Sequence, residues 1–299
     1  MPRKCGAMEV HHRLLETYAQ FRQAQADLEQ ATRARRMRPA LFRAAGPVNI
    51  PVVVHVVWNQ AAENIADAQV NSQIDALNRD YAAANADRTN TPACWSGLVS
   101  DTTIQFHLAK TDPTGAATSG IVRVQTNKAS FGTDDAVKSA ATGGSDPWPS
   151  DRYLNIWVCN LGGGILGYAQ FPGGPPATDG VVILNTAFGT NGTATAPFNL
   201  GRTATHEVGH YFNLRHIWGD TEDCSGNDFV DDTPNALLPN YGVPTFPHVS
   251  CDNGPNGDMF MNYMDYVDDR AMVMFTAGQV LRMQAALAGP HASLTTSTV

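Results

Sequence analysis

The sequence predicts an α+β fold, with a sheet in the first half of the chain and a loop-rich second half. Several short segments rich in β-branched residues lie within 48–188, with one helical segment among them, which is typical of an α+β or α/β lobe. Residues 219–274 contain many turn formers and show little periodicity. One more helical segment follows at 276–287, with Thr276 at its start as a capping residue.

Composition limits the classes of protein and partner. The chain has 299 residues, 43% of them hydrophobic, which suits one large domain or two unequal lobes. The net charge is -8 and the body of the chain has no basic stripe, so we expect no nucleic-acid partner. No apolar run is long enough to span a bilayer. The basic start has no apolar run behind it, so secretion requires a signal already removed or another route.

The N-terminal segment differs in composition from the rest of the chain. Residues 9–46 are rich in Ala, Gln, Arg and Glu, with Leu, Tyr and Phe at helical spacing, and predict a helix of several turns. A basic stretch that proteases specific for basic residues can cut precedes Gly46; it contains Arg33, Arg35, Arg36, Arg38 and Arg43. The alternative is an N-terminal helix that packs permanently on the domain.

The predicted sheet begins immediately after this segment. Residues 48–59 (VNIPVVVHVVWN) are strongly β-branched and predict a buried strand. Residues 65–83 carry apolar side chains at helical spacing and predict an amphipathic helix. Further strands are predicted at 102–109, 120–126, 152–160 and 180–188.

Two other segments have a mixed character. Residues 162–172 (GGGILGYAQFP) start with three glycines and then alternate, which predicts a loop that leads into an edge strand. Residues 199–214 (NLGRTATHEVGHYFNL) have a helical pattern, with Thr203 or Thr205 near the start.

The stretch HEVGHYFNLRH concentrates metal-binding residue types. His206 and His210 are four residues apart, so on a helix they share one face and can reach one zinc ion. Glu207 lies beside the first ligand, in position to act through a metal-bound water. The alternative, three ordinary histidines without a metal, is hard to reconcile with this spacing.

His216 strengthens the metal interpretation. It lies six residues after His210, so the chain must reverse between the two. Asn213 stands where the reversal is needed, and Asn readily adopts the left-handed conformation that ends many helices. Three histidines leave the fourth tetrahedral position open, which is the pattern of a catalytic zinc site.

The motif resembles that of the metzincin metallopeptidases, HExxHxxGxxH followed by a turn that contains methionine. Asn213 replaces the usual glycine, and Met264 in NYMDYVDD, 48 residues after His216, is the candidate for the turn methionine. More closely, FNLRHIWGD, CSGNDFVDDTPN, GDMFMNYMDY and MFTAGQVLRM resemble the pappalysin family and its ulilysin-like members, over roughly residues 48–290.

This resemblance implies the metzincin fold. An N-terminal lobe of twisted, mostly parallel sheet with helices is expected over about 46–213. A C-terminal lobe of loops with one helix is expected over about 214–299, with the active-site cleft between the lobes. Residues 1–45 are then expected to form a pro-segment.

The expected activity is that of a zinc endopeptidase. Zinc polarises the scissile carbonyl and acidifies its water, and Glu207 transfers the proton to the leaving amine. The resemblance places Tyr266, two residues after the turn methionine, to stabilise the oxyanion. A half-buried packing role is the alternative for this tyrosine.

Substrate is expected to lie along the edge strand of the upper lobe. Within 162–171 we expect contacts from Gly164, Ile165 and Leu166; a flexible loop is the alternative. Ulilysin-like relatives prefer Lys or Arg after the cut and use an acidic residue beyond the turn methionine. Here the candidate pocket residues are Asp268, Asp269 and Arg270, and the basic residue leaves an altered pocket open.

A calcium site is predicted in DCSGNDFVDDTP. Asp228, Asp231 and Asp232 offer hard oxygen ligands, with the backbone carbonyls of Val230 and Thr233 completing the shell. The resemblance also implies calcium here, as one or two structural ions. A solvated acidic loop is the alternative reading of the same residues.

The cysteines suggest two roles. The resemblance implies a disulfide between Cys224 and Cys251, while Cys94 and Cys159 either pair or stay free. Cys5, in the sequence RKCG, is the odd cysteine, and its thiolate is a good zinc ligand. Relatives are kept latent by such a cysteine, so cleavage near 36–43 is expected to release the active enzyme. A stray N-terminal thiol is the alternative.

We therefore expect a secreted, monomeric zinc endopeptidase that acts on polypeptides and is made as a latent precursor. One competing hypothesis is a binding or adhesion module on an inactive protease fold, against which the intact Glu207 argues. Another is a zinc hydrolase of small amides or terminal residues. Internal cleavage of an unfolded protein distinguishes these possibilities.

Overall fold

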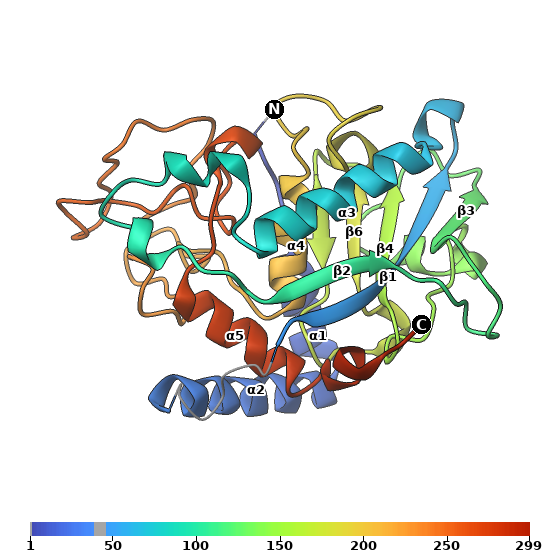
Figure 1. Cartoon of the computed structure of the whole chain (residues 1–299), viewed down its shortest axis with the longest axis horizontal. Coiled ribbons are helices and arrows are strands. Elements are labelled where there is room, and N and C mark those ends of the chain that lie inside the picture. The colour runs from blue at the N-terminus through green and yellow to red at the C-terminus, as the bar shows by residue number, and fades with distance from the viewer. Residues whose placement is uncertain (1, 39–45) are drawn as a thin grey trace.

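A six-stranded sheet forms the centre of the N-terminal lobe. The computed structural model describes residues 2–38 and 46–299. The strand order is β2-β1-β4-β6-β5, with β3 paired to β1, and each pairing is parallel except that of β5 with β6. The strands are β1 Val48–Trp58, β2 Ile104–Leu108, β3 Ile121–Gln125, β4 Leu154–Cys159, β5 Gly167–Ala169 and β6 Val181–Leu184 (Figure 1). The predicted α+β fold with a mostly parallel sheet is confirmed.

The central position of β1 follows from its sequence. Its residues from Ile50 to Val57 are all buried, because both faces of a parallel sheet are covered and neither can carry polar side chains cheaply. Residues 48–52 of β1 pair with β2, and residues 54–58 pair with β3. The opposite edge of β1 pairs with β4, so one long strand connects three neighbours.

Two helices cover one face of the sheet. The predicted amphipathic helix is α3, Asp67–Tyr81, which packs on β2. Helix α4, Arg202–Tyr211, packs on β5 and β6 and also contacts α3. It begins after Gly201, whose φ of 81° is the left-handed conformation that glycine adopts without strain. All residues of α4 are buried, which fixes its side chains firmly at the end of the sheet.

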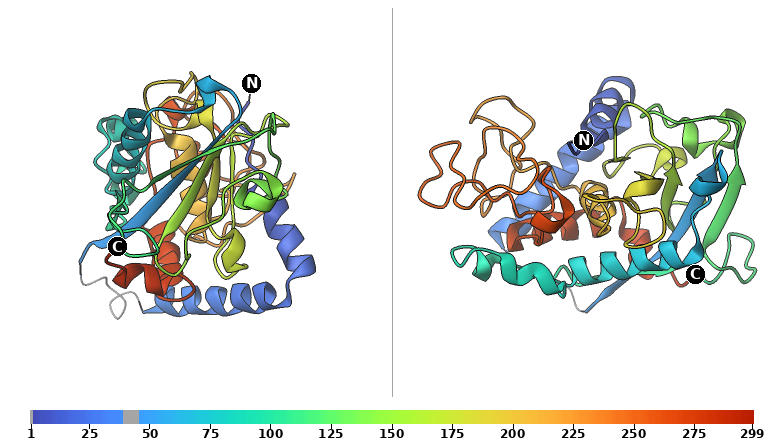
Figure 2. Two further views of the ribbon diagram at one scale, coloured as in Figure 1. Left: turned by 90° about the vertical axis from the view of Figure 1, so that its right-hand side faces the viewer. Right: turned by 90° about the horizontal axis from the view of Figure 1, so that it is seen from above.

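The second half of the chain forms a loop-rich region at one end of the sheet (Figure 2, right). The predicted disulfide between Cys224 and Cys251 is present, whereas Cys94 and Cys159 are free. Helix α5, Ala277–Leu287, follows, and its first turn is closed by reciprocal hydrogen bonds between Thr276 and Gln279. This capping box confirms the predicted start of the helix.

The N-terminal segment forms two helices, not one as the sequence predicted. Helix α1, Ala7–Thr17, and helix α2, Ala19–Met37, meet at an angle because Tyr18 between them has an extended backbone (Figure 2, left). Helix α2 packs along α5 (Figure 1). Of the predicted cleavage region 36–43, only Arg36 to Arg38 belong to the described residues.

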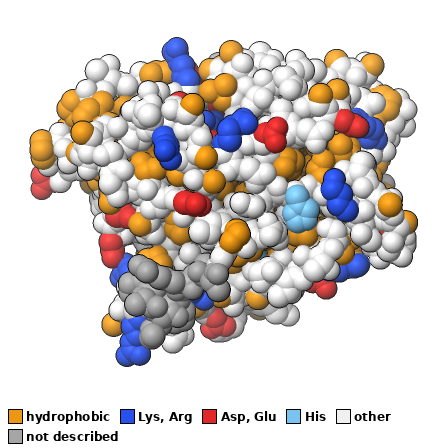
Figure 3. All heavy atoms as spheres, viewed as in Figure 1, with side chains coloured by type: hydrophobic (Ala, Val, Ile, Leu, Met, Phe, Trp, Pro, Cys, Tyr) orange, Lys and Arg blue, Asp and Glu red, His pale blue; other side chains and the backbone are white. Residues whose placement is uncertain are grey.

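The length of the helices and the charges on one face of the surface bear on membrane and nucleic-acid binding. Among the described residues, no helix has the length and apolar character needed to cross a membrane. On the face drawn in Figure 3, acidic and basic side chains are interspersed with exposed hydrophobic ones, and no basic stripe appears on that face.

Candidate metal centre and active site

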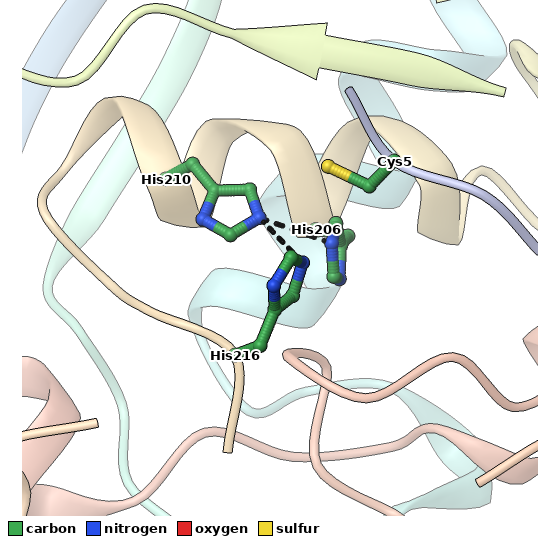
Figure 4. A group of neighbouring side chains, drawn as sticks. All are labelled: Cys5, His206, His210 and His216. Carbon is green, nitrogen blue, oxygen red and sulfur yellow. Dashed lines mark hydrogen bonds between the residues drawn. The ribbon is translucent and has the colours of Figure 1, made fainter. Parts of the chain in front are cut away.

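Three histidine side chains converge on one point at the end of the sheet. His206 and His210 project from the same face of α4, and His216 reaches them from the returning chain (Figure 4). The reversal is made at Asn213, whose φ of 73° is the left-handed conformation predicted for it. The Nε2 atom of His210 lies 3.2 Å from that of His206 and 3.1 Å from that of His216.

The hydrogen bonds of these rings show that the point of convergence suits a cation. Each Nδ1 faces an acceptor: the carbonyl of Tyr263 for His206, that of Leu214 for His210, and the Asp220 carboxylate for His216. Each Nδ1 therefore carries the proton, and three bare Nε2 lone pairs face one another. Burial and the neighbouring histidines lower the pKa of His206 and His210 well below the usual range, so neither ring is charged. This donor set fits a zinc ion.

A methionine supports the metal-binding helix from below. Met264 is fully buried, and a side chain at Gly209 of α4 would meet its sulfur at 2.5 Å. The glycine therefore permits the turn 262–266 to pack directly beneath the histidines. Met264, the predicted turn methionine, thus packs against the helix that carries His206 and His210.

Cys5 completes a group of four candidate ligands. Its Sγ and the histidine nitrogens all lie within 4.8 Å of one another, and the segment that carries it passes in front of α4 (Figure 4). The sulfur also lies 3.4 Å from Oε2 of Glu207, and the Cys5 amide donates to the Tyr266 hydroxyl over 3.3 Å. Burial raises the pKa of Glu207 to about 8, although Cys5 and Arg3 oppose the shift. The predicted zinc ligands, Glu207 and Tyr266 thus surround one centre.

The segment before α1 pairs with the edge strand of the sheet. Leu166 donates its amide to the carbonyl of Lys4, and Gly6 donates to the carbonyl of Gly167, each over 2.9 Å. Of the predicted edge residues, Leu166 takes part in this pairing, Ile165 packs close to Gly6, and Gly164 lies in the preceding turn. Gly167, which the sequence did not single out, is required because a Cβ there would lie 2.8 Å from Cγ of Glu207.

The side chain of Arg3 is buried near the metal centre, where its charge acts on Glu207. Its guanidinium donates to Oδ1 of Asp269 over 2.6 Å, to the carbonyl of Val267 and to the hydroxyl of Thr203. It also lies over the ring of Phe198, 5.0 Å from the centroid. Both side chains of the Arg3–Asp269 pair are almost fully buried. A basic side chain therefore fills the space next to the reacting centre.

A family model described as pregnancy-associated plasma protein-A, peptidase M43, matches residues 113–288. The chain belongs to the M43 peptidase family. It is therefore a zinc metallopeptidase of that family, as the sequence predicted. An extracellular metalloprotease of Pyricularia oryzae is 33% identical, over 95% of this chain and 88% of the relative. Such relatives, which include a second extracellular metalloprotease from Arthroderma otae, agree with the predicted secretion.

Solved structures extend this similarity to almost the whole of this chain. A mutant of promirolysin from Tannerella forsythia has a TM-score of 0.89 and 44% identity, over 98% of this chain and 97% of its own. Mature mirolysin in complex with a cleaved peptide has a TM-score of 0.83 and 49% identity, over 85% of this chain and 97% of its own. These matches confirm the pappalysin-type, ulilysin-like fold of the M43 peptidase.

The candidate pocket residues differ in burial, and a further acidic residue contacts a histidine of the metal centre. Of the three pocket candidates, Asp269 is fully buried against Arg3, Asp268 is half-buried, and Arg270 is exposed. Asp220, which the sequence analysis did not single out, accepts from His216 over 2.6 Å and so orients that ring. The spacing of four residues between His216 and Asp220 was the signal in the sequence that could have indicated this contact.

The side chains that the sequence predicted as calcium ligands do not all lie around one point. Asp228 is buried and accepts from the Val230 amide and, over 2.7 Å, from the Thr233 hydroxyl. Asp231 is exposed and pairs with Arg36. Asp232 accepts from Thr276 and Gly278 and so caps α5. Within 2–38 and 46–299, the one group of three or more His, Cys, Asp or Glu side chains placed to hold a metal is that of Cys5 and the histidines.

Proposed function

We propose that the protein is a secreted, monomeric zinc endopeptidase made as a latent precursor. Residues 1–45 are its pro-segment and residues 46–299 its catalytic domain. The matches to promirolysin and to mature mirolysin support this boundary, because the precursor covers 98% of this chain and the mature enzyme 85%. Cys5 acts as the fourth zinc ligand of the latent form, and its distance from the three histidine nitrogens supports this role.

The side chains around the metal centre have distinct chemical tasks. His206, His210 and His216 would hold the zinc ion, which would supply Lewis acidity for peptide hydrolysis. Glu207 accepts the proton of the attacking water and returns it to the leaving amine. The Tyr266 hydroxyl, which meets the Cys5 amide in the latent form, donates to the negative oxygen that develops on the substrate.

The substrate takes the place of residues 3–6 along the edge strand. The backbone groups of Leu166 and Gly167 that pair with the pro-segment then bind the backbone of an extended polypeptide. Arg3 occupies the pocket expected for the residue after the cut. Its ion pair with Asp269 supports a preference for Arg or Lys at that position.

Replacing Asp269 by Asn should remove this preference. A buried charge left without its partner costs about 2–5 kcal/mol, so kcat/KM for a peptide with Arg after the cut should fall by about 30-fold or more. A matched peptide with Leu at that position should change far less. Asp268→Asn, which alters the neighbouring half-buried carboxylate, is the control. Equal losses on both peptides would assign Asp269 a structural role only.

We also propose one calcium ion at Asp228, without Asp231 or Asp232 among its ligands. The Thr233 hydroxyl lies 2.7 Å from the Asp228 carboxylate and 3.0 Å from the carbonyl of Val230. Three oxygen atoms that could bind calcium therefore lie close together. Burial raises the pKa of Asp228 to about 7, and a bound cation would favour its ionised form.

Calcium should therefore stabilise the protein through Asp228. At a calcium concentration 100 times the dissociation constant, binding should add about 2.7 kcal/mol to the free energy of unfolding. Thermal unfolding with calcium or with a calcium-selective chelator measures this difference. Asp228→Asn should abolish the response, whereas Asp231→Asn should leave it intact. A melting temperature that is independent of calcium in the wild type contradicts the site.

The observation that carries the proposed function is the convergence of the imidazole nitrogens of His206, His210 and His216 beside Glu207 and Cys5. The test is mass spectrometry of an unfolded protein after digestion, with and without a zinc chelator. Internal cuts that disappear on chelation and return with zinc are expected. Release of terminal residues alone would favour a hydrolase of small substrates, and zinc binding without any cleavage would favour an inactive binding module.

A further inference from the structure

A second, partly buried ion pair joins the pro-segment to the catalytic part of the chain, far in sequence from Cys5. Glu29 of α2 accepts two hydrogen bonds from Arg282 of α5, over 2.9 Å from Nη1 and 2.6 Å from Nη2. Arg282 is only 1% exposed. Paired charged hydrogen bonds of this geometry are among the strongest polar contacts in proteins.

The same guanidinium also holds the turn that shapes the metal centre. Nε of Arg282 donates to the carbonyl of Asn213 over 3.1 Å. Asn213 is fully buried and stands between His210 and His216, where its left-handed backbone reverses the chain. One arginine thus connects the pro-segment to the turn that delivers the third histidine.

The pairing with Arg282 keeps Glu29 ionised. Burial would raise the pKa of Glu29, but the hydrogen bonds and charge of Arg282 lower it.

The other carboxylate near Arg282 has partners of its own. Asp228 acts on Arg282 but accepts from Thr233 and Val230. Removal of α2 would therefore leave the Arg282 guanidinium without its paired carboxylate.

We propose that Arg282 forms a carboxylate-binding site on the catalytic domain, and that its occupant is Glu29 of this chain. The inference rests on the proposed role of residues 1–45 as a pro-segment. Filling the site retains α2 independently of Cys5 and holds the Asn213 turn. A cut between α2 and β1 is then insufficient for release, because the excised segment stays bound as a helix whose acidic side chain pairs with Arg282.

The experiment measures how fast the excised segment dissociates, without using enzymatic activity. The full chain carrying Glu207→Gln, which does not cut itself, is nicked between α2 and β1 by a trace of added trypsin. Size-exclusion chromatography over time then gives the fraction of the segment still bound. Glu29→Gln in this background should accelerate dissociation by about 10-fold to 100-fold, as expected for loss of a charged hydrogen-bonded pair. Asp27→Asn, an exposed acidic residue of the same helix, is the control and should dissociate like the parent.

A second variant tests the site itself. In a folded Arg282→Gln chain, Glu29→Gln should have little further effect on dissociation, because the partner is already absent. Equal dissociation rates for parent and Glu29→Gln would overturn the proposal, as would an undiminished effect of Glu29→Gln in the Arg282→Gln chain. Neither outcome affects the proposed function, which depends on zinc-dependent cleavage by the wild-type protein.

Discussion

The Glu207→Gln protein should keep its fold and its zinc while losing about 10²-fold to 10⁴-fold in kcat/KM. The amide has nearly the same shape as the carboxylate but cannot accept the proton of the attacking water. Shape matters at this position, because Cγ of Glu207 packs 2.8 Å from where a Cβ of Gly167 would lie. Glutamine preserves that packing, whereas alanine would leave a gap beside the edge strand.

Initial rates on an internally quenched peptide, together with zinc content and thermal unfolding, measure this effect. Glu222→Gln, which changes an exposed glutamate in the loop-rich region, should retain wild-type activity. If Glu207→Gln holds stoichiometric zinc and cleaves as fast as the wild type, another group must supply the base. A loss of zinc with the activity would mean that Glu207 mainly supports the metal site.

Replacing Cys5 by Ala should give the uncut chain measurable peptidase activity, at least about tenfold above that of the uncut wild type. Loss of 1.4 kcal/mol of latent-state stabilisation is enough for that factor, and a thiolate ligand to zinc is worth more. The increase should stop short of full activity, because Arg3 still fills the pocket beside Asp269. Adding Arg3→Ala to the same chain should raise the rate further.

The measurement is the initial rate before any cleavage of the chain, verified by intact mass. Cys94→Ala, which removes an exposed free cysteine, serves as the matched control and should remain latent. An uncut Cys5→Ala chain with the low rate of the wild type would show that the sulfur plays no part in latency. The pro-segment would then inhibit by occupying the cleft alone.

Local sequence was sufficient for the features that depend on spacing. The interval from His206 to His210 is one helical turn, and Asn213 supplies the left-handed residue that brings back His216. The capped start of α5 at Thr276 depends likewise on neighbouring residues. The run of buried residues in β1 indicated a covered sheet for the same reason. Such features are determined by interactions between residues a few positions apart, so the sequence displays them.

Features that join distant parts of the chain were not readable in this way. Arg3 meets Asp269 across 266 positions, and Glu29 meets Arg282 across 253. The sequence placed the pocket at Asp268, Asp269 or Arg270 and left the choice open, because neighbouring residues differ only in which way they point. In the folded chain Asp269 is buried against Arg3, Asp268 is half-buried and Arg270 is exposed. Asp231 and Asp232 were likewise grouped with Asp228 by proximity in sequence, but one pairs with Arg36 and the other caps α5.

The sequence by itself therefore determined the metal-binding motif, the strand and helix types and the family resemblance, since these follow from local periodicity and residue chemistry. The tertiary structure alone decided which charged groups meet. Folding buried Arg3 and Arg282 with carboxylates from the other end of the chain, and a buried charge requires a partner wherever in the sequence that partner lies.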